Sequence, residues 1–245
     1  MLILVFFLLT SLISAVELPT PLNKAVNIIN QPLPNLVGET LAYSIFLNNI
    51  SLGQQILTFE SIISYEGRSV YVVKFNCRPN LMMKALNYRN NEKYYLDTET
   101  LLPLYIFREY SGGFNKGSME FFFREKTSEV DVFITEKASK RRFSTSVTEP
   151  FQGETTFILF SRFVDLKKTP LIEIISSTGK NYFQLFSGCE EKITVPAGSF
   201  QAELALINSD AGKIWLSKDI FRVPLKIILN INAGCLEMNL LSIKR

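Results

Sequence analysis

The feature that most constrains the fold is a two-residue alternation of apolar and polar side chains that recurs along most of the chain. It is clear in Leu41, Tyr43, Ile45 and Leu47, and again in the segment 225–231 (LKIILNI). Turn signals such as Asn48-Asn49 and Glu66-Gly67 separate neighbouring segments. Since successive side chains of a β-strand point to opposite faces of a sheet, this pattern predicts many strands joined by tight turns.

The predicted elements place the chain in the mainly β class. Strands are expected over 40–47, 50–65, 70–77, 93–97, 104–110, 118–124, 130–135, 142–147, 172–176, 182–186, 192–195, 202–208, 213–216, 225–231 and 235–243. Helices are expected at 80–87 and at 155–166 (TTFILFSRFVDL), although the many Phe residues of the latter also suit a buried strand. Together they predict a curved antiparallel meander that forms an incomplete or closed β-barrel with one or two short helices.

Three segments of different composition follow one another. Residues 1–15 (MLILVFFLLTSLISA) have an apolar stretch that ends in small residues, which is typical of a signal peptide cleaved after Ala15. An uncleaved anchor is the alternative, but a membrane-spanning helix needs roughly 20 apolar residues. Residues 16–36 are Pro-rich and predict an extended N-terminal arm. Residues 37–245 are then expected to form a single antiparallel β domain. Because of the signal peptide, the mature protein is expected in the periplasm or outer envelope if the source is Gram-negative.

The 245-residue chain contains no histidine, and this excludes several chemistries. Neither a Ser-His-Asp triad nor a His-ligated zinc or haem site can be built. The formal net charge of +3 is too small to indicate nucleic-acid binding. One basic cluster, 137–142 (KASKRR), suits either a solvated turn or a peripheral contact with anionic lipid or polysaccharide. We therefore expect no metal, no cofactor and no nucleic-acid partner.

The three cysteines are Cys77, Cys189 and Cys235. An exported protein can form disulfides, and a Cys189–Cys235 bridge between neighbouring strands is conceivable. The odd number and the wide spacing favour three small buried apolar side chains instead.

Four segments together carry a family resemblance. They read GETLAYSIFLNNISLGQQILTFE, YYLDTETLLPLYIFRE, TVPAGSFQAELA and IWLSKDIFRVPLKI. In this order they resemble the bacterial exported proteins of domain-of-unknown-function 3108, over residues 37–243. The matching residues include Gly38, Glu39, Tyr43, Gly53, Asp97, Pro103, Pro196, Gly198, Phe200, Trp215, Asp219 and Arg222.

The resemblance implies a fold similar to the lipoprotein carriers and receptors of the bacterial envelope, an incomplete barrel with helices in its concave face. It implies no catalytic residues, because the family has no agreed function. The matching residues also have structural explanations: Gly198 suits a turn with positive φ, Asp97 a side-chain-to-backbone turn, and Pro103 the start of an edge strand. Trp215 is expected in the core, and Asp219 can pair with Arg222 across a turn.

The first functional hypothesis is a non-enzymatic binding or structural module. A curved sheet lined with aromatic side chains can enclose an apolar small molecule or lipid. The expected lining residues are Phe121, Phe123, Phe157 and Phe160. The consecutive Phe121, Phe122 and Phe123 must point to both faces of their strand, so at least one of them points outward or lies under another layer.

Two other hypotheses remain open. One is an envelope enzyme that acts on polysaccharide with carboxylates or tyrosines, for which Glu39, Asp97, Glu109 and Glu120 are the candidate acids. The other is a protein that docks an envelope partner through an exposed strand edge.

Overall fold

The computed structural model describes residues 29, 33–112, 115–136, 139–148, 150–208 and 210–245. The predicted signal peptide and most of the predicted arm lie outside these residues. The strands are β1 Thr40–Leu47, β2 Ile50–Tyr65, β3 Arg68–Pro79, β4 Arg89–Asp97, β5 Pro103–Gly112, β6 Asn115–Arg124, β7 Glu129–Glu136, β8 Ser139–Ser146, β9 Phe151–Gly153, β10 Leu171–Ser176, β11 Gly179–Val195, β12 Gly198–Ile207, β13 Gly212–Ser217, β14 Pro224–Ile231 and β15 Gly234–Lys244. The helices are α1 Leu81–Ala85 and α2 Thr156–Ser161, with 3₁₀ turns at Glu125–Thr127 and Leu166–Lys168.

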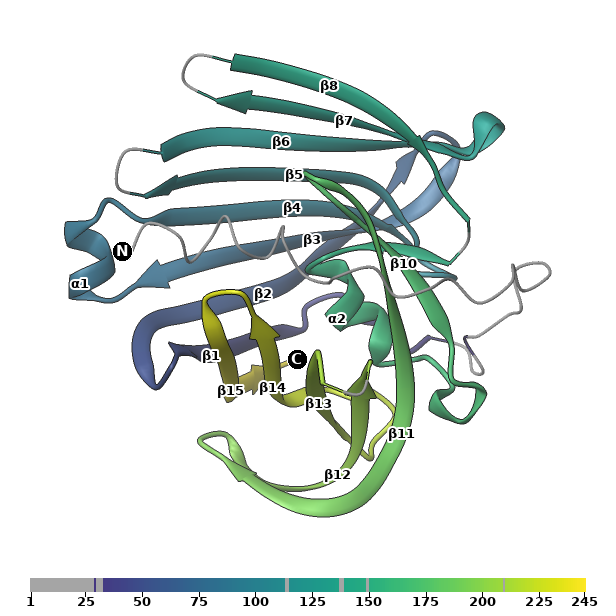
Figure 1. The fold of residues 1–245 in the computed structure, drawn as a ribbon. Coiled ribbons are helices and arrows are strands. Elements are labelled where there is room, and N and C mark those ends of the chain that lie inside the picture. Colours follow the sequence, from purple (N-terminus) through teal and green to yellow (C-terminus); the bar gives the residue numbers. More distant parts are fainter. Residues whose placement is uncertain (1–28, 30–32, 113–114, 137–138, 149, 209) are drawn as a thin grey trace.

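All strands belong to one 15-stranded sheet, in the order β8-β7-β6-β5-β4-β3-β2-β1-β15-β14-β13-β12-β11-β10-β9. Neighbours are antiparallel except β9 and β10, which are parallel. The sheet curls round α2 without closing, and β8 and β9 form its two edges (Figure 1). The predicted mainly β fold is therefore confirmed, and of the two forms foreseen, the incomplete barrel is the one observed.

The predicted turns have the backbone that hairpins require. Asn48 and Asn49 have φ values of 47° and 64°, and Glu66 and Gly67 have 50° and 81°. Two consecutive positive φ angles are the mark of the type I′ hairpin turn, whose twist matches that of the flanking strands. Gly198 also has a positive φ, of 138°, as predicted.

The concave face of the sheet is filled by the protein's own side chains. The alternating residues of β1 form one buried set, with burial on every second position. Phe157 and Phe160 of α2 are 1% and 2% exposed and pack in the same core cluster. Leu36, from the end of the predicted arm, is fully buried there as well. The helix α2 is thus an interior element that the sheet surrounds (Figure 1).

Several details differ from the sequence-based expectations. The two predicted strands at 182–186 and 192–195 are one bent strand, β11. Pro103 begins β5, an internal strand between β4 and β6, where the first position tolerates a missing N–H donor. The cysteines are free thiols, so the Cys189–Cys235 bridge is not formed. They are not all buried either: Cys189 is exposed, and Cys77 and Cys235 are half-buried.

Candidate functional site

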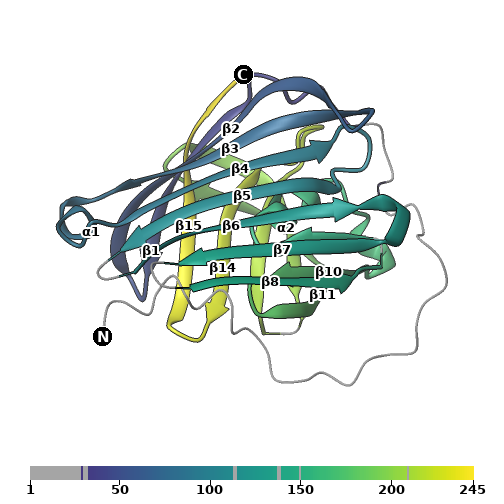
Figure 2. The ribbon, with the colours of Figure 1, turned by 90° about the horizontal axis from the view of Figure 1, so that it is seen from above.

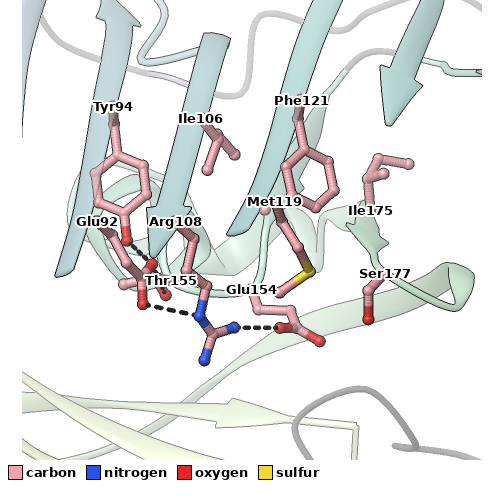
Figure 3. Close-up of a pocket in the computed structure, with 11 residues that line it drawn as sticks. Glu92, Tyr94, Ile106, Arg108, Met119, Phe121, Glu154, Thr155, Ile175 and Ser177 are labelled. Atoms are coloured by element: carbon pink, nitrogen blue, oxygen red, sulfur yellow. Dashed lines mark hydrogen bonds and ion pairs between the residues drawn. The ribbon is translucent and has the colours of Figure 1, made fainter. Parts of the chain in front are cut away.

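A small cavity lies between the inner face of β4–β6 and the turn that leads into α2. Its volume is about 30 Å³, enough for about two water molecules. Figure 3 shows its lining residues, which come from three parts of the chain. They are Glu92, Tyr94, Ile106, Arg108, Met119, Phe121, Gly153, Glu154, Thr155, Ile175 and Ser177.

Arg108 is the central charge of this cavity. It projects inward from β5 and is only 7% exposed. Its Nε donates a hydrogen bond of 3.0 Å to Asn90 and lies 3.6 Å from a Glu92 oxygen, while its Nη1 lies 3.9 Å from a Glu154 oxygen. Two carboxyl groups therefore flank the guanidinium at distances longer than those of a close charge-assisted hydrogen bond.

Glu92 is held by a dense set of donors. Asn90 Nδ2 donates to one carboxylate oxygen at 2.7 Å, and Thr155 Oγ1 donates to the other at 3.1 Å. The Tyr94 hydroxyl donates to the same second oxygen. Burial, together with the neighbouring Glu92 carboxylate, raises the pKa of Tyr94 well above its usual range. Tyr94 therefore stays protonated and fixes the position of Glu92.

Glu154 is the least satisfied group of the cavity. Its Oε1 is buried and has no hydrogen-bond partner. Burial raises the pKa of Glu154 to about 8, although the Arg108 charge opposes this shift. At neutral pH the carboxyl group is thus mainly protonated, and it neutralises Arg108 less than an ionised carboxylate would.

The cavity combines a charged wall with an apolar one. Ile106, Met119, Phe121 and Ile175 form the apolar side in Figure 3, facing the Arg108–Glu154 pair. Among the described residues there is no cluster of three Cys, Asp or Glu that could hold a metal ion. The cavity thus places a buried guanidinium beside an apolar surface.

The predicted apolar lining residues lie in different parts of the interior. Phe121 lines the cavity directly. Phe123 lies 4.8 Å from Phe151, and Phe157 lies 5.0 Å from Phe183, measured between ring centroids. Phe160 is buried in the core cluster. Only one of the four thus contacts the cavity, and the others hold α2 and β9 against the sheet.

A second buried cluster, which we call the clasp, brings several family residues together. Arg162, just after α2, is fully buried and its Nη1 lies 2.7 Å from Glu39 Oε1. Arg162 Nε and Nη2 both donate to the Phe221 carbonyl, at 2.9 and 2.7 Å. Arg222 donates to the Arg162 carbonyl, and its Nη1 lies 2.7 Å from Glu203. The clasp ties the end of α2 to three separate parts of the sheet.

Asp219 and Tyr43 support the clasp without a direct charge pair. Asp219 Oδ1 accepts from the backbone N–H groups of Phe221 and Arg222, at 2.9 and 3.0 Å. The expected Asp219–Arg222 side-chain pair is replaced by this turn, since the Arg222 guanidinium pairs with Glu203 instead. The Tyr43 hydroxyl donates to the Pro224 carbonyl at 2.8 Å, and burial raises the pKa of Tyr43 above its usual range.

The other family residues are found at turns, within or at the start of strands, and on the outer face. Gly38 has a φ of 89°, and Gly53 has a φ of 128°. Asp97 Oδ1 accepts from the N–H groups of Glu99 and Thr100, both at 2.9 Å, which forms the predicted turn. The remaining family residues are Pro103 at the start of β5, Pro196 in the β11–β12 turn, Gly198 at the start of β12, and Phe200 and Trp215, both half-buried.

Trp215 differs from its expected place in the core. It packs only partly against the core cluster, and its indole N–H donates to Glu191 at 2.6 Å. Its position on β13 alternates with the buried Ile214 and Leu216, so its ring points to the outer face.

The four candidate acids of the enzyme hypothesis have separate environments. Glu39 belongs to the clasp, and Asp97 accepts the hydrogen bonds of its turn. Glu109 is exposed, and Glu120 accepts from the Tyr105 hydroxyl at 3.3 Å. None of the four lines the cavity.

The cavity and clasp residues that the sequence reasoning missed carry a recognisable signal. Glu92 and Arg108 occupy positions of β4 and β5 that alternate in step with buried apolar residues, Tyr94 and Ile106 among them. A charged residue on the apolar side of a strand needs a buried partner. That pattern could have identified Glu92 and Arg108 before the structure.

Within the described parts of the chain, no helix is long and apolar enough to cross a membrane.

Comparisons with known proteins agree on the fold. The sequence profile of a family described as "Protein of unknown function (DUF3108)" matches residues 42–240, which confirms the resemblance. No curated protein matches. A β-barrel-like protein of domain of unknown function DUF1849 from Brucella abortus aligns with a TM-score of 0.51 at 8% identity, over 85% of this chain and 97% of that one.

Two further solved structures align over similar lengths but with lower scores. One is described as exported and YmcC-like in fold, from Bacteroides fragilis, with a TM-score of 0.31 at 8% identity, over 87% of this chain and 98% of that one. The other is described as a lipoprotein, from Parabacteroides distasonis, with a TM-score of 0.33 at 10% identity, over 86% of this chain and 97% of that one.

Proposed function

Because this chain belongs to the DUF3108 family, which carries no assigned activity, we propose its function from the cavity: an exported, non-enzymatic module of the cell envelope that binds a fatty acid or a similar apolar ligand with a carboxylate end. The observation that carries the proposal is the buried Arg108 guanidinium at the boundary between a polar and an apolar wall.

Arg108 is suited to an anionic guest. A buried guanidinium needs a carboxylate, and it binds one best through two parallel hydrogen bonds. Its contact with Glu154 is 3.9 Å long, and the raised pKa of Glu154, about 8, leaves that carboxyl mainly protonated at neutral pH. A fatty-acid carboxylate can therefore bind the Arg108 Nη atoms in place of the long contact with Glu154, while Glu92 keeps its contact with Nε.

The apolar wall offers a path for the acyl chain. The cavity holds only about two waters as it stands, so a chain must displace side chains of the interior. Met119 is flexible and adapts to different shapes. The short segment from Gly153 into α2 covers the other side. An acyl chain that displaces this segment would contribute about 0.8 kcal/mol of hydrophobic free energy for each methylene group that it buries.

Export is tested by the mass of the mature protein. When the full chain is expressed in a Gram-negative host, the purified protein should begin at Val16 and be released with the periplasmic fraction. A purified protein that keeps residues 1–15 and fractionates with membranes would support the anchor instead.

Ligand binding is tested with a fluorescent fatty acid and with native mass spectrometry of the periplasmic protein. We expect R108M to lose binding and R108K to bind weakly, since a lysine cannot form the two parallel hydrogen bonds. The control is R89M, which removes an exposed arginine from the neighbouring strand β4. Equal binding by R108M and wild type, or no binding by wild type, would contradict the proposal.

The enzyme hypothesis retains one supporting observation. Glu92 and Glu154 line the same cavity, and a carboxyl group with a raised pKa is a feature of general acids. The cavity holds about two waters as it stands, and a sugar ring is broader than an acyl chain. A sugar would therefore have to displace more of the interior side chains, and this favours binding over hydrolysis. If the protein released reducing ends from envelope polysaccharide and E154Q abolished this activity, the enzyme hypothesis would be favoured over the binding hypothesis.

A further inference from the structure

The outer face of the sheet carries a continuous line of aromatic rings, which we call the aromatic row. It runs across the strands from β2 to β7 and consists of Tyr65, Tyr95, Tyr105, Phe122 and Phe133. Successive ring centroids lie 4.9, 5.2, 5.0 and 5.6 Å apart. The Arg142 guanidinium of β8 lies 4.9 Å from the Phe133 ring and extends the row to the sheet edge.

The register of the sheet builds this row. Tyr95 lies directly opposite Tyr105 in the β4–β5 pair, and Tyr105 lies opposite Phe122 in the β5–β6 pair. Phe122 is the outward member of the Phe121–Phe123 triplet, whose other two rings are buried. The row is therefore a set of side chains aligned on one face, one from each of several neighbouring strands.

The row lies on an open surface. All five rings are half-buried, and Tyr105, Phe122 and Phe133 lie outside the interior core cluster and the residues packed against it. Figure 2 looks onto this face of β4–β8, and no described helix or strand lies over it. Cross-strand aromatic pairs stabilise a sheet by themselves. A contiguous apolar surface left open to water is also the usual mark of an interaction site.

The charges beside the row are mixed. Lys93 lies 5.0 Å from the Tyr95 ring centroid, and Glu120 accepts from the Tyr105 hydroxyl. Asp131 pairs with Arg124 and with Arg142, the latter at 3.6 Å. A surface for nucleic acid or for anionic lipid would be uniformly basic. Here positively and negatively charged side chains alternate, and Lys93, Glu120 and Arg142 border the row.

We propose that the aromatic row binds an unbranched, uncharged glycan strand. The flat faces of pyranose rings carry weakly positive C–H groups, which are attracted to the negative faces of aromatic rings. The hydroxyl groups at the ring edges both donate and accept, so they match the mixed border of Lys93, Glu120 and Arg142. Successive rings of the row are tilted by 55°, 40°, 51° and 89° against one another, so the row offers a series of ring edges and partly exposed faces along which the sugars of one strand can lie. This site is on the opposite face of the sheet from the cavity and is independent of the proposed ligand there.

The experiment is isothermal titration calorimetry, which measures the affinity of the full mature protein for chitohexaose and for cellohexaose. The row variant is Y105V/F122V, because valine removes the rings and keeps the strand propensity. The control is W215V, which removes a half-buried aromatic ring from the distant strand β13. Like rings of the row, Trp215 has a cation beside it, since Lys226 Nζ lies 6.0 Å from its ring centroid. We expect wild type and W215V to bind at least one hexasaccharide and Y105V/F122V to bind about tenfold or more weakly.

A second variant distinguishes loss of binding from loss of the fold. F122L keeps an apolar side chain of similar size but has no aromatic face, and its far-UV circular dichroism and urea midpoint should stay close to wild type. It should nevertheless bind the hexasaccharide more weakly. Binding of neither hexasaccharide by wild type, equal binding by F122L and wild type, or binding only to vesicles of anionic phospholipid would each overturn the proposal.

Discussion

The Arg162 guanidinium and the Glu39 carboxylate form a fully buried ion pair, 2.7 Å apart, between two points of the chain separated by 123 residues. Glu39 stands just before β1, and Arg162 just after α2. The pair therefore fixes the interior helix to the middle of the sheet. The Arg245 side chain adds a second contact to Glu39 at 3.2 Å and covers the Phe221 ring.

R162M should destabilise the protein by about 3 kcal/mol or more, because it leaves Glu39 buried with only Arg245 as a partner. Urea unfolding followed by circular dichroism measures the change. The double variant E39Q/R162M should recover part of the loss, since no buried charge then remains unpaired. R142M removes a largely exposed arginine, and its partner Asp131 keeps a second ion pair with Arg124, so it should cost less than about 1 kcal/mol. Equal costs for R162M and R142M would show that the clasp contributes little.

G53A should be far more costly than G67A. Both glycines have positive φ, but a Cβ at Gly53 would lie 2.4 Å from the Arg78 carbonyl oxygen, whereas a Cβ at Gly67 would meet nothing within 4 Å. We expect about 1 kcal/mol for G67A, from backbone strain alone, and at least 2 kcal/mol for G53A. The urea midpoints of the two variants decide the matter, and a smaller loss for G53A would contradict the close approach of β2 and β3.

The pH dependence of stability should report on Glu154. The pKa of Glu154 in the folded state is about 8, above the usual value of 4.5. Between these two pH values, the folded state therefore keeps a proton on Glu154 that the unfolded state has lost. Stability should therefore fall as pH rises from about 5 to 8, by at most about 1.4 kcal/mol for each pH unit from this group.

E154Q removes that proton equilibrium. Its melting temperature should vary less between pH 5 and pH 8 than that of wild type, and it should exceed the wild-type value at pH 8. The control E109Q changes an exposed glutamate of β5 and should follow the wild-type curve. Parallel curves for E154Q and wild type would contradict the raised pKa.

The three thiols should react with a disulfide reagent in order of exposure. Cys189 is exposed and should react first, whereas burial raises the pKa of Cys77 to about 12 and slows its reaction. Ellman's reagent should count all three thiols in urea without reductant. A count of one thiol in urea would instead mean that a bridge forms.

C189S tests whether Cys189 is the thiol that reacts first. In the folded protein it should remove the fast phase of the reaction and leave the slow phases unchanged. The variant should unfold at the same urea concentration as wild type, because an exposed cysteine makes few packing contacts.

Local sequence patterns predicted most of the strands and turns, because alternation and turn residues act over a few positions. Asn48-Asn49 and Glu66-Gly67 specify their hairpins through their own backbone preferences. The order of the strands was not accessible in this way. The pairing of β1 with β15, and the parallel pairing of the three-residue strand β9, depend on contacts between distant segments.

The candidate sites were harder to predict for the same reason. Glu39 and Arg222 were recognised as family residues, but their common partner Arg162 lies in a segment whose Phe residues dominate the pattern. Glu92 and Arg108 come from neighbouring strands, and only the register places them together. Strand geometry alone predicted that at least one ring of the Phe121–Phe123 triplet points outward or lies under another layer. That Phe122 is the outward ring, and which aromatic rings lie beside it, required the order of the sheet.

The pairing of β1 with β15 has a consequence for how the protein is made. Within the hydrogen-bonded sheet, the two halves β1–β8 and β9–β15 are joined only where the first strand pairs with the last, so this central pair cannot form until the C-terminal residues are available. Folding of such a long-range pair is slow compared with that of the hairpins on either side. A chain that cannot pair its first and last strands before synthesis ends stays incompletely folded until then, which fits the export that we propose.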